Sequence, residues 1–304
     1  MSAVTISFAE GERHLDWMAL TEAIAHGHTL PRAHVEDVFI RRGADTLLNR
    51  SAWIDGMGVA VKAATVFPGN PAEGKPMIGG AVNLFSDADG ALEAILDFHL
   101  VTKWKTAGDS LLAARRLARP DSERILIVGA GTVGRNLIDA YSAAFPAARF
   151  TIWNRTRDKA EAMAAELGDV AVAGDLGAAV AEADIVASAT MTTEPILRGA
   201  WLRPGQHIDM IGAYRPDMRE ADDEVLRRGR LFVDSRETTI PHIGELMIPI
   251  ATGVIGPEAV IADFYDGAAF RRETDEEITV FKNGGGAHLD LMVSRYILDA
   301  WNGG

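Results

Sequence analysis

The feature that most constrains the fold is a regular alternation of patterns between residues 124 and 280. Short runs rich in β-branched residues alternate there with stretches whose apolar residues recur every three to four positions. This alternation is typical of βαβ units in an α/β fold with a parallel, doubly wound sheet. Helices are expected at residues 135–145 and 158–167. We expect strands at residues 124–129, 149–154, 170–174, 184–190, 207–212 and 230–235.

The first of these strands runs into the sequence GAGTVG, a turn with the G-x-G-x-x-G spacing. Gly129 permits the tight turn, Gly131 lets a pyrophosphate approach the backbone, and Gly134 lets the following helix pack closely on the strand. Thr132 and Val133 complete the turn at the helix N-terminus, where free N–H groups bind the pyrophosphate. Because the motif follows a strand and opens a helix, it predicts a dinucleotide site and not merely a glycine-rich turn.

The residues after the second strand indicate which dinucleotide binds. An acidic residue usually stands there in NAD-binding domains and binds the ribose hydroxyls. Here the positions are Asn154, Arg155 and Thr156. A planar cation and neutral polar groups suit a 2′-phosphate, so we expect NADP(H), with NAD(H) as the alternative. The alternative for Arg155 itself is a solvated surface residue.

The segment before the turn has a different pattern. Short β-like runs at 56–70, 79–87 and 92–99 are separated by Gly, Pro, Asn and Asp, which predicts a mostly antiparallel sheet. A helix over 103–120 then leads into the nucleotide-binding part, and a second helix over 289–301 follows the sequence NGGG. We therefore expect two domains. The first covers residues 1–120 and is completed by 284–304, and the second, which binds the dinucleotide, covers 121–283.

Composition excludes several classes of function. A net charge of −13 argues against nucleic-acid binding, which depends on clustered Lys and Arg. The absence of cysteine excludes disulfides and thiolate chemistry, and no apolar run is long enough for a membrane span. We expect a cytoplasmic protein without a membrane or nucleic-acid partner.

The histidines do not have the spacing of metal ligands. We interpret His26 and His28 as a polar helix end and His288 as a helix-start residue, and we expect no metal.

Several ordered motifs point to a known family. The sequences IWNRT, TTEPIL, IGAYRPDMREADDEVL, FVDSRE and ITVFKNGGGAHLD, together with the segment from residue 62 onward, resemble the ornithine cyclodeaminase/μ-crystallin family. The resemblance implies a Rossmann domain inserted in a second α/β domain that binds substrate and forms a homodimer. It thereby accounts for a nucleotide turn that begins more than a hundred residues into the chain.

The resemblance also implies roles for three cationic residues. Lys62 interrupts the apolar run VAVKAATVF, where it is either a pocket lysine, as the family implies, or an edge-strand lysine with its head in water. Its implied role is to hold the substrate carboxylate and to polarise or protonate the imine. Arg50 lies near the family's carboxylate-binding arginine, with a surface arginine as the alternative. Lys105 replaces the arginine of the family segment LTxxRTAA, which exchanges a bidentate clamp for a point charge.

Two further segments are expected beside the nicotinamide. Ala189, Thr190 and Met191 follow the fourth strand, at the sheet edge that faces the cofactor in doubly wound folds. Asn283 and Gly285 match the family's Ser-x-Gly, with a flexible hinge before the last helix as the alternative.

Tyr214 separates the activities found in this family. Cyclodeaminases carry an aspartate in the segment that here reads GAYRPDMRE, and a phenol is a poor base at neutral pH. The segment instead resembles the ketimine reductases. We therefore predict NAD(P)H-dependent reduction of Δ1-pyrroline-2-carboxylate or Δ1-piperideine-2-carboxylate to L-proline or L-pipecolate. The alternatives are an ornithine cyclodeaminase and a non-catalytic NADPH-dependent binder of the μ-crystallin kind.

Overall fold

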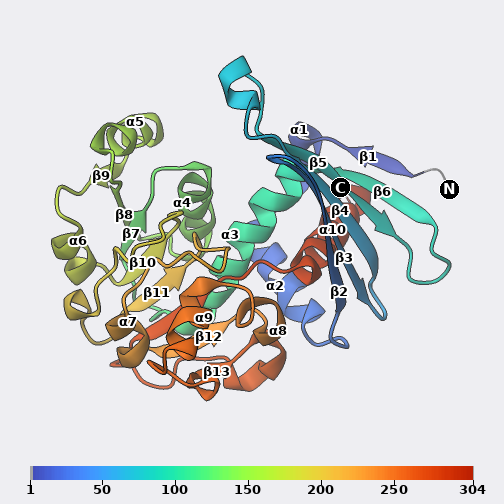
Figure 1. Cartoon of the computed structure of the whole chain (residues 1–304). Coiled ribbons are helices and arrows are strands. Elements are labelled where there is room, and N and C mark those ends of the chain that lie inside the picture. Colours follow the sequence, from blue (N-terminus) through green and yellow to red (C-terminus); the bar gives the residue numbers. More distant parts are fainter. Residues whose placement is uncertain (1–2, 304) are drawn as a thin grey trace. The chain divides into compact units, whose positions relative to one another are not determined.

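The computed structural model describes residues 3–303 and divides into two compact units (Figure 1). The first unit comprises Met1–Lys105 and Gly286–Gly304, and the second comprises Thr106–Gly285. The second unit is therefore an insertion in the sequence of the first. Its first boundary falls inside a long helix, Phe98–Leu117, and its second falls just before the last helix, Ala287–Gly303.

The first unit contains a six-stranded sheet with the order β1-β6-β5-β4-β3-β2. β1 pairs with β6 in parallel and every other pair is antiparallel, which confirms the mostly antiparallel sheet expected upstream of the glycine turn. The strands are β1 Val4–Ile6, β2 His34–Arg42, β3 Asp45–Ile54, β4 Gly58–Val66, β5 Ile78–Phe85 and β6 Leu92–Asp97.

The helices of the first unit are α1 Phe8–Gly11, α2 Trp17–Gly27, the first turns of α3 Phe98–Leu117, and α10 Ala287–Gly303. α10, the last helix of the chain, packs against β2 to β5 and against α2. The run predicted as a strand over 92–99 is wrong in its last two residues, because α3 already begins at Phe98. Asp97 causes this early start, since its Oδ1 accepts hydrogen bonds from the backbone N–H groups of His99 and Leu100.

The second unit contains an eight-stranded sheet with the order β13-β12-β14-β11-β10-β7-β8-β9. Every strand pair is parallel, which confirms the predicted doubly wound sheet. All six expected strands are present, but two more were not predicted, β13 and β14. The strands are β7 Arg124–Val128, β8 Arg149–Trp153, β9 Val170–Val172, β10 Ile185–Ser188, β11 His207–Met210, β12 Arg230–Val233, β13 Val260–Ala262 and β14 Thr279–Lys282.

The strand order creates a reversal point between β7 and β10. From β7 the chain steps outward to β8 and β9, and then returns to the other side of β7 to form β10. In doubly wound sheets, ligands bind beyond the carboxyl ends of the strands at such a reversal. The helices of this unit are α4 Thr132–Ala144, α5 Arg157–Leu167, α6 Leu176–Glu182, α7 Asp223–Arg228, α8 Arg236–Thr239 and α9 Gly244–Ala251.

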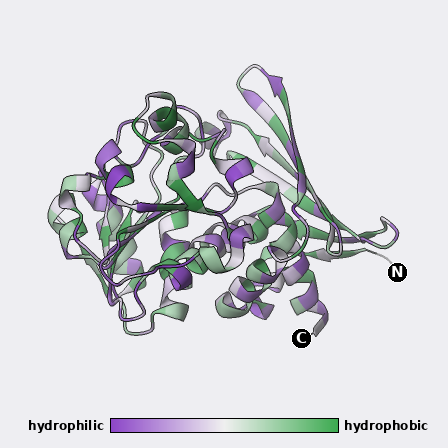
Figure 2. Ribbon diagram, turned by 90° about the horizontal axis from the view of Figure 1, so that it is seen from below, coloured by the Kyte–Doolittle hydropathy of each residue, from purple (hydrophilic) through white to green (hydrophobic). Residues whose placement is uncertain are grey.

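The central strands of the second sheet are buried on both faces. All four residues of β10, β11 and β14 are buried, as expected for a parallel sheet covered by helices. Green hydrophobic residues are frequent along the strands in Figure 2, and purple hydrophilic residues are frequent in turns and helices. Within residues 3–303, no helix is long and apolar enough to cross a membrane.

Candidate functional site

The glycine turn joins β7 to α4 and has the geometry that a dinucleotide needs. Gly129 has φ of +119°, which disfavours any side chain, and its N–H donates to the carbonyl of Trp153 at 2.8 Å. A Cβ on Gly134 would stand 2.2 Å from the Gly129 oxygen, so only glycine lets α4 approach the strand this closely. Gly131, in contrast, faces open space.

The start of α4 is also available to an anion. Gly131 is the N-cap residue, and no side chain of the described residues caps this helix. Thr132 and Val133 form its first turn, whose N–H groups lack partners within the helix. Open space beside Gly131 and uncapped N–H groups fit a pyrophosphate, so these residues suit a dinucleotide.

Asn154, expected to contact the coenzyme, is hydrogen-bonded to the turn. Its Oδ1 accepts a hydrogen bond from Ala130 N at 3.1 Å, and its Nδ2 donates to the Thr156 carbonyl at 2.8 Å. The side chains that remain exposed after β8 are those of Arg155 and Thr156. A contact with a 2′-phosphate would therefore fall to Arg155.

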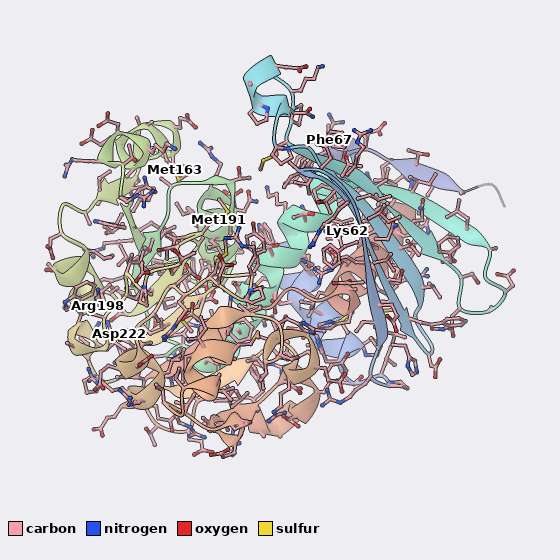
Figure 3. All side chains as sticks on the ribbon, viewed as in Figure 1. Lys62, Phe67, Met163, Met191, Arg198 and Asp222 are labelled. Atoms are coloured by element: carbon pink, nitrogen blue, oxygen red, sulfur yellow. The ribbon has the colours of Figure 1, made fainter. Side chains whose placement is uncertain are left out.

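The loop after β10 lies against the glycine turn. Ala189 N donates to the Val128 carbonyl at 2.8 Å, and a Cβ on Gly129 would stand 2.8 Å from the Ala189 oxygen and 3.3 Å from Cγ2 of Thr190. Met191, labelled in Figure 3, is 72% exposed. Ala189 and Thr190 thus lie at the reversal point of the sheet, where the sequence placed them.

Asn283 and Gly285 follow β14 at the same edge of the sheet. Asn283 is buried, and its Nδ2 donates to the Thr106 carbonyl and to Ser110 Oγ, both at 3.0 Å. Gly285 has φ of +67° and donates its N–H to Oδ2 of Asp234 at 2.7 Å. Both residues are hydrogen-bonded to other parts of the second unit, and their approach to a nicotinamide stays a prediction.

A second set of functional side chains lies in the first unit, around Lys62 of β4. The Lys62 ammonium donates to Oδ1 of Asp290 on α10 and to Oγ1 of Thr102 on α3, both at 2.9 Å, and lies 4.6 Å from the centre of the Phe98 ring. Lys105 Nζ is 3.7 Å from the same oxygen of Asp290. Lys62 is 5% exposed, so the alternative of an edge-strand lysine with its head in water is wrong.

Strand register brings Arg50 beside Lys62. On adjacent strands Asp37, Arg50 and Lys62 stand directly opposite one another, so they form one row across β2, β3 and β4 on a single face. The Arg50 guanidinium donates to both carboxylate oxygens of Asp37 at 2.9–3.1 Å. This partial pairing holds Arg50 in place next to the lysine.

The charges of this cluster act on its buried members. Burial raises the pKa of the Asp290 carboxyl, but the positive charges of Lys105, Lys62 and Arg50 outweigh that effect and lower it. Burial, aided by the charge of Lys105, lowers the pKa of His288 to about 3, so this imidazole is neutral at pH 7. Asp290 Oδ2 has no hydrogen-bond partner among the described side chains and backbone groups. Two ammonium groups therefore lie beside one carboxylate oxygen.

Comparison with known proteins identifies the family. The model of the ornithine cyclodeaminase/mu-crystallin family matches residues 51–304. The chain belongs to this family. It is 52% identical to the Δ1-pyrroline-2-carboxylate reductase of Paracoccus denitrificans, over 96% of this chain and 95% of that protein.

Two solved structures of similar proteins share the fold of this family member. The Δ1-pyrroline-2-carboxylate reductase of Thermococcus litoralis in complex with NADH and L-proline has a TM-score of 0.89 at 25% identity, with 99% and 98% of the chains covered. An archaeal alanine dehydrogenase dimer with bound NAD has a TM-score of 0.90 at 25% identity, with 100% and 97% covered. The resemblance inferred from the motifs is confirmed, and these structures support a nicotinamide cofactor.

Tyr214, at the position where cyclodeaminases of the family carry an acid, is 56% exposed. The guanidinium of its neighbour Arg215 lies 5.8 Å from the centre of its ring. Arg215 itself pairs with Asp217 at 2.9 Å. The loop therefore presents a phenol to solvent, and the carboxylate of Asp217 in the same loop is already paired with an arginine.

The two histidines at the end of α2 differ in burial. His26 is exposed, whereas His28 is buried at the end of α2, with Nδ1 at 2.8 Å from the Ile24 carbonyl and its ring 5.4 Å from that of His288. No group of three or more potential metal ligands occurs within residues 3–303.

Sequence reasoning missed a group of buried charged residues at the carboxyl edge of the second sheet. Its members are Asp209, Glu220, Asp234, Glu245 and Lys282, all of them fully or almost fully buried. Lys282 Nζ donates to the carbonyls of Met210 and Asn283 at 2.8 and 2.7 Å. The sequence could have indicated this group by the positions of its members. Asp209, Asp234 and Lys282 each lie within one residue of the end of a strand.

Proposed function

We propose that the chain is an NAD(P)H-dependent reductase of a cyclic ketimine carboxylate. The substrate would be Δ1-pyrroline-2-carboxylate, giving L-proline, with Δ1-piperideine-2-carboxylate, giving L-pipecolate, as a second substrate. The observation that carries this proposal is the buried cluster in which Lys62 and Lys105 share Asp290. The Paracoccus denitrificans reductase and the Thermococcus litoralis reductase with L-proline support it.

The cluster suits the carboxylate of such a substrate. Lys62 and Lys105 place two ammonium groups beside Asp290, and Arg50, which is paired with Asp37, adds a third cation in the same row. A substrate carboxylate would pair with these cations in a buried place where charge pairing is stronger than in water. The Lys62 ammonium is also the proton donor that we assign to the imine nitrogen, because Asp290 and Thr102 hold it in one position.

The second unit would hold the coenzyme. The glycine turn and the first turn of α4 bind the pyrophosphate, and Arg155 binds a 2′-phosphate, which gives a preference for NADP(H) over NAD(H). When bound, the reduced nicotinamide supplies the hydride that a C=N bond accepts. Ala189, Thr190, Met191, Asn283 and Gly285 are the residues we assign to the nicotinamide end.

The proposal also assigns a role to each unit. The first unit binds substrate and forms a homodimer, and the second binds the dinucleotide. Support for a dimer comes from β2, an edge strand on which Val38, Phe39 and Ile40 are 53%, 53% and 58% exposed. An exposed apolar edge strand is prone to pair with another chain. The archaeal alanine dehydrogenase of similar fold is a dimer. The cytoplasmic location stays a prediction.

The test mixes the purified protein with Δ1-pyrroline-2-carboxylate and either NADPH or NADH, and follows loss of coenzyme absorbance and formation of L-proline. We expect turnover with both coenzymes, with kcat/KM about tenfold higher for NADPH, since a charge-assisted contact with a phosphate contributes about 1.5–3 kcal/mol. Equal values for the two coenzymes would remove the preference but leave the reductase.

The same protein is then supplied with ornithine and oxidised coenzyme. Little or no ammonia is expected, because Tyr214 replaces the carboxylate that cyclodeaminases carry. Ammonia and proline formed in equal amounts would instead establish a cyclodeaminase. Absence of turnover with either substrate, together with coenzyme binding, would establish a binding protein of the crystallin kind.

A further inference from the structure

Glu220 is a buried carboxylate that the proposed reaction does not use. It is 0% exposed and lies eight residues after Gly212, the glycine that follows β11. A charged side chain with no exposure must be fully hydrogen-bonded to be tolerated. The identity of its partners therefore says what the residue does.

Both oxygens of Glu220 are used, and each binds a different loop. Oε1 accepts from Ser188 Oγ at 2.6 Å, from Thr190 N at 2.8 Å and from Thr190 Oγ1 at 3.0 Å. Oε2 accepts from Gly212 N at 2.6 Å and from Ala213 N at 3.1 Å. One side chain thus ties the loop after β10 to the loop after β11.

The two loops touch each other and the glycine turn. A Cβ on Gly212 would stand 2.0 Å from the Thr190 oxygen, so the loops are in direct backbone contact. The loop after β10 in turn contacts Gly129 through Ala189 and Thr190. Glu220 therefore binds a loop that itself contacts the glycine turn assigned to the pyrophosphate.

Glu220 is itself held from the opposite side. Its N–H donates to Oε2 of the buried Glu245 at 2.6 Å, and its carbonyl accepts from the N–H groups of Ile196 and Leu197 at 2.9 Å. Hydrogen bonds therefore hold both the backbone and the carboxylate of Glu220 in place. Such an arrangement couples the two loops and resists their separation.

We propose that Glu220 is a positioning residue that fixes the loops after β10 and β11 for the nicotinamide end of the coenzyme. This inference rests on the proposed function, because it requires that the second unit bind a nicotinamide dinucleotide. It predicts that loss of the carboxylate weakens binding of the whole coenzyme more than binding of a fragment that lacks the nicotinamide.

The test is Glu220→Gln, which keeps the size of the side chain. An amide has one acceptor oxygen and one donor nitrogen, so either Thr190 N or the pair Gly212 N and Ala213 N must lose its acceptor, whichever way the amide points. Kd is measured for NADPH or NADH, whichever binds more tightly, and for its adenosine fragment, 2′,5′-ADP or AMP. Melting temperature is recorded for every protein.

Asp184→Asn is the matched control. Asp184 is a buried carboxylate that also accepts from two backbone N–H groups, those of Glu123 and Arg124, but it directly precedes β10, at the opposite end of that strand. We expect the ratio of Kd for coenzyme to Kd for fragment to rise about tenfold or more in Glu220→Gln and to stay unchanged in Asp184→Asn. Equal weakening of both ligands in Glu220→Gln, or no weakening, would show a purely structural role and overturn the inference.

Two further outcomes are decisive. If Glu220→Gln does not fold, Ser188→Ala removes a single hydroxyl from Oε1, and the same ratio should rise about threefold, whereas an unchanged ratio overturns the inference. If the unaltered protein binds neither dinucleotide, both the proposed function and the inference about Glu220 fail. If the unaltered protein binds a dinucleotide and the ratio does not change in the variant, only the inference about Glu220 fails.

Discussion

At the scale of single residues, a buried ammonium needs a partner, and the partner of Lys62 lies 228 positions away in the sequence. The apolar run around Lys62 shows only that a charge is present in a strand. The structure shows that Lys62 is 5% exposed, forms an ion pair with Asp290 and lies near Lys105, and we propose that this arrangement binds an anion. Removing one partner of a buried pair costs roughly 3–5 kcal/mol, so any variant here must be checked for folding.

Lys62→Met tests this cluster directly. The substitution keeps an apolar stem of similar length and removes the charge, so kcat/KM for the imine should fall about a hundredfold or more while the protein still folds, because Lys105 continues to balance Asp290. Lys103→Met is the control, since Lys103 stands on the same helix as Lys105 and pairs with Glu12 at 2.7 Å. Near-normal turnover by Lys62→Met would exclude Lys62 from the reaction. Steady-state kinetics and circular dichroism provide both measurements.

At the scale of elements, β14 is one of two strands of the second sheet that were not predicted. Its residues Thr279, Val280 and Phe281 favour a strand, but the run is only four residues long, ends in a lysine and precedes a glycine cluster. The strand forms because it fits between β11 and β12, where all four residues are buried and Lys282 donates to two carbonyls. Pairing with two neighbouring strands here stabilises a run that is short in the sequence.

The contact between β11 and α4 makes stability depend on pH. Asp209 of β11 accepts a hydrogen bond from the Tyr141 hydroxyl of α4 at 2.7 Å, and burial raises the pKa of Asp209 from 3.8 to about 7. The folded state therefore holds this proton more tightly than the unfolded state. As pH rises from about 4 to about 7, the unfolded state loses the proton first, so the contribution of Asp209 to stability falls.

Asp209→Asn removes this contribution while an amide oxygen can still accept from Tyr141. The free energy of unfolding of the variant, relative to the unaltered protein, should increase from pH 5 to about pH 7, as measured by urea unfolding. Burial also lowers the pKa of His207 and His288 to about 3, which adds an opposite slope, but that slope is common to both proteins. Asp139→Asn, an exposed change on α4, is the control. A difference that does not vary with pH would contradict the prediction.

At the scale of the whole molecule, β2 is unusual for an edge strand. Three consecutive residues, Val38, Phe39 and Ile40, are all more than half exposed, so both faces of the strand present apolar side chains. Natural edge strands are commonly protected by charge, twist or a covering element. A second copy of the chain is the occupant that we propose for this edge.

Phe39→Glu should shift the protein from dimer to monomer, because it places a charge in the proposed interface. Sedimentation velocity measures the change, and Ile261→Glu serves as the control, since Ile261 is also an exposed apolar residue, at 37%, but belongs to the second unit. A dimer that survives Phe39→Glu, or an unaltered protein that is monomeric, would show that β2 does not mediate assembly.

The sequence by itself determined the features that depend on neighbouring residues. The glycine turn, the six strands from β7 to β12, helices α4 and α5, and the family membership all follow from patterns that span a few to a few dozen residues. These patterns are readable because backbone conformation and amphipathic burial act over short distances along the chain.

Only the tertiary structure decided which side chains meet. Asp290 is joined to Lys62, Arg50 stands in one row with Asp37 and Lys62, and Glu220 binds the ends of two loops. The amide oxygen of Asn154 accepts a hydrogen bond from the N–H of Ala130 in the glycine turn, and its contact with the coenzyme stays a prediction. Ion pairs and hydrogen bonds act over a few ångströms in space. Strand order and register set those distances, and neither produces a repeating pattern in the sequence.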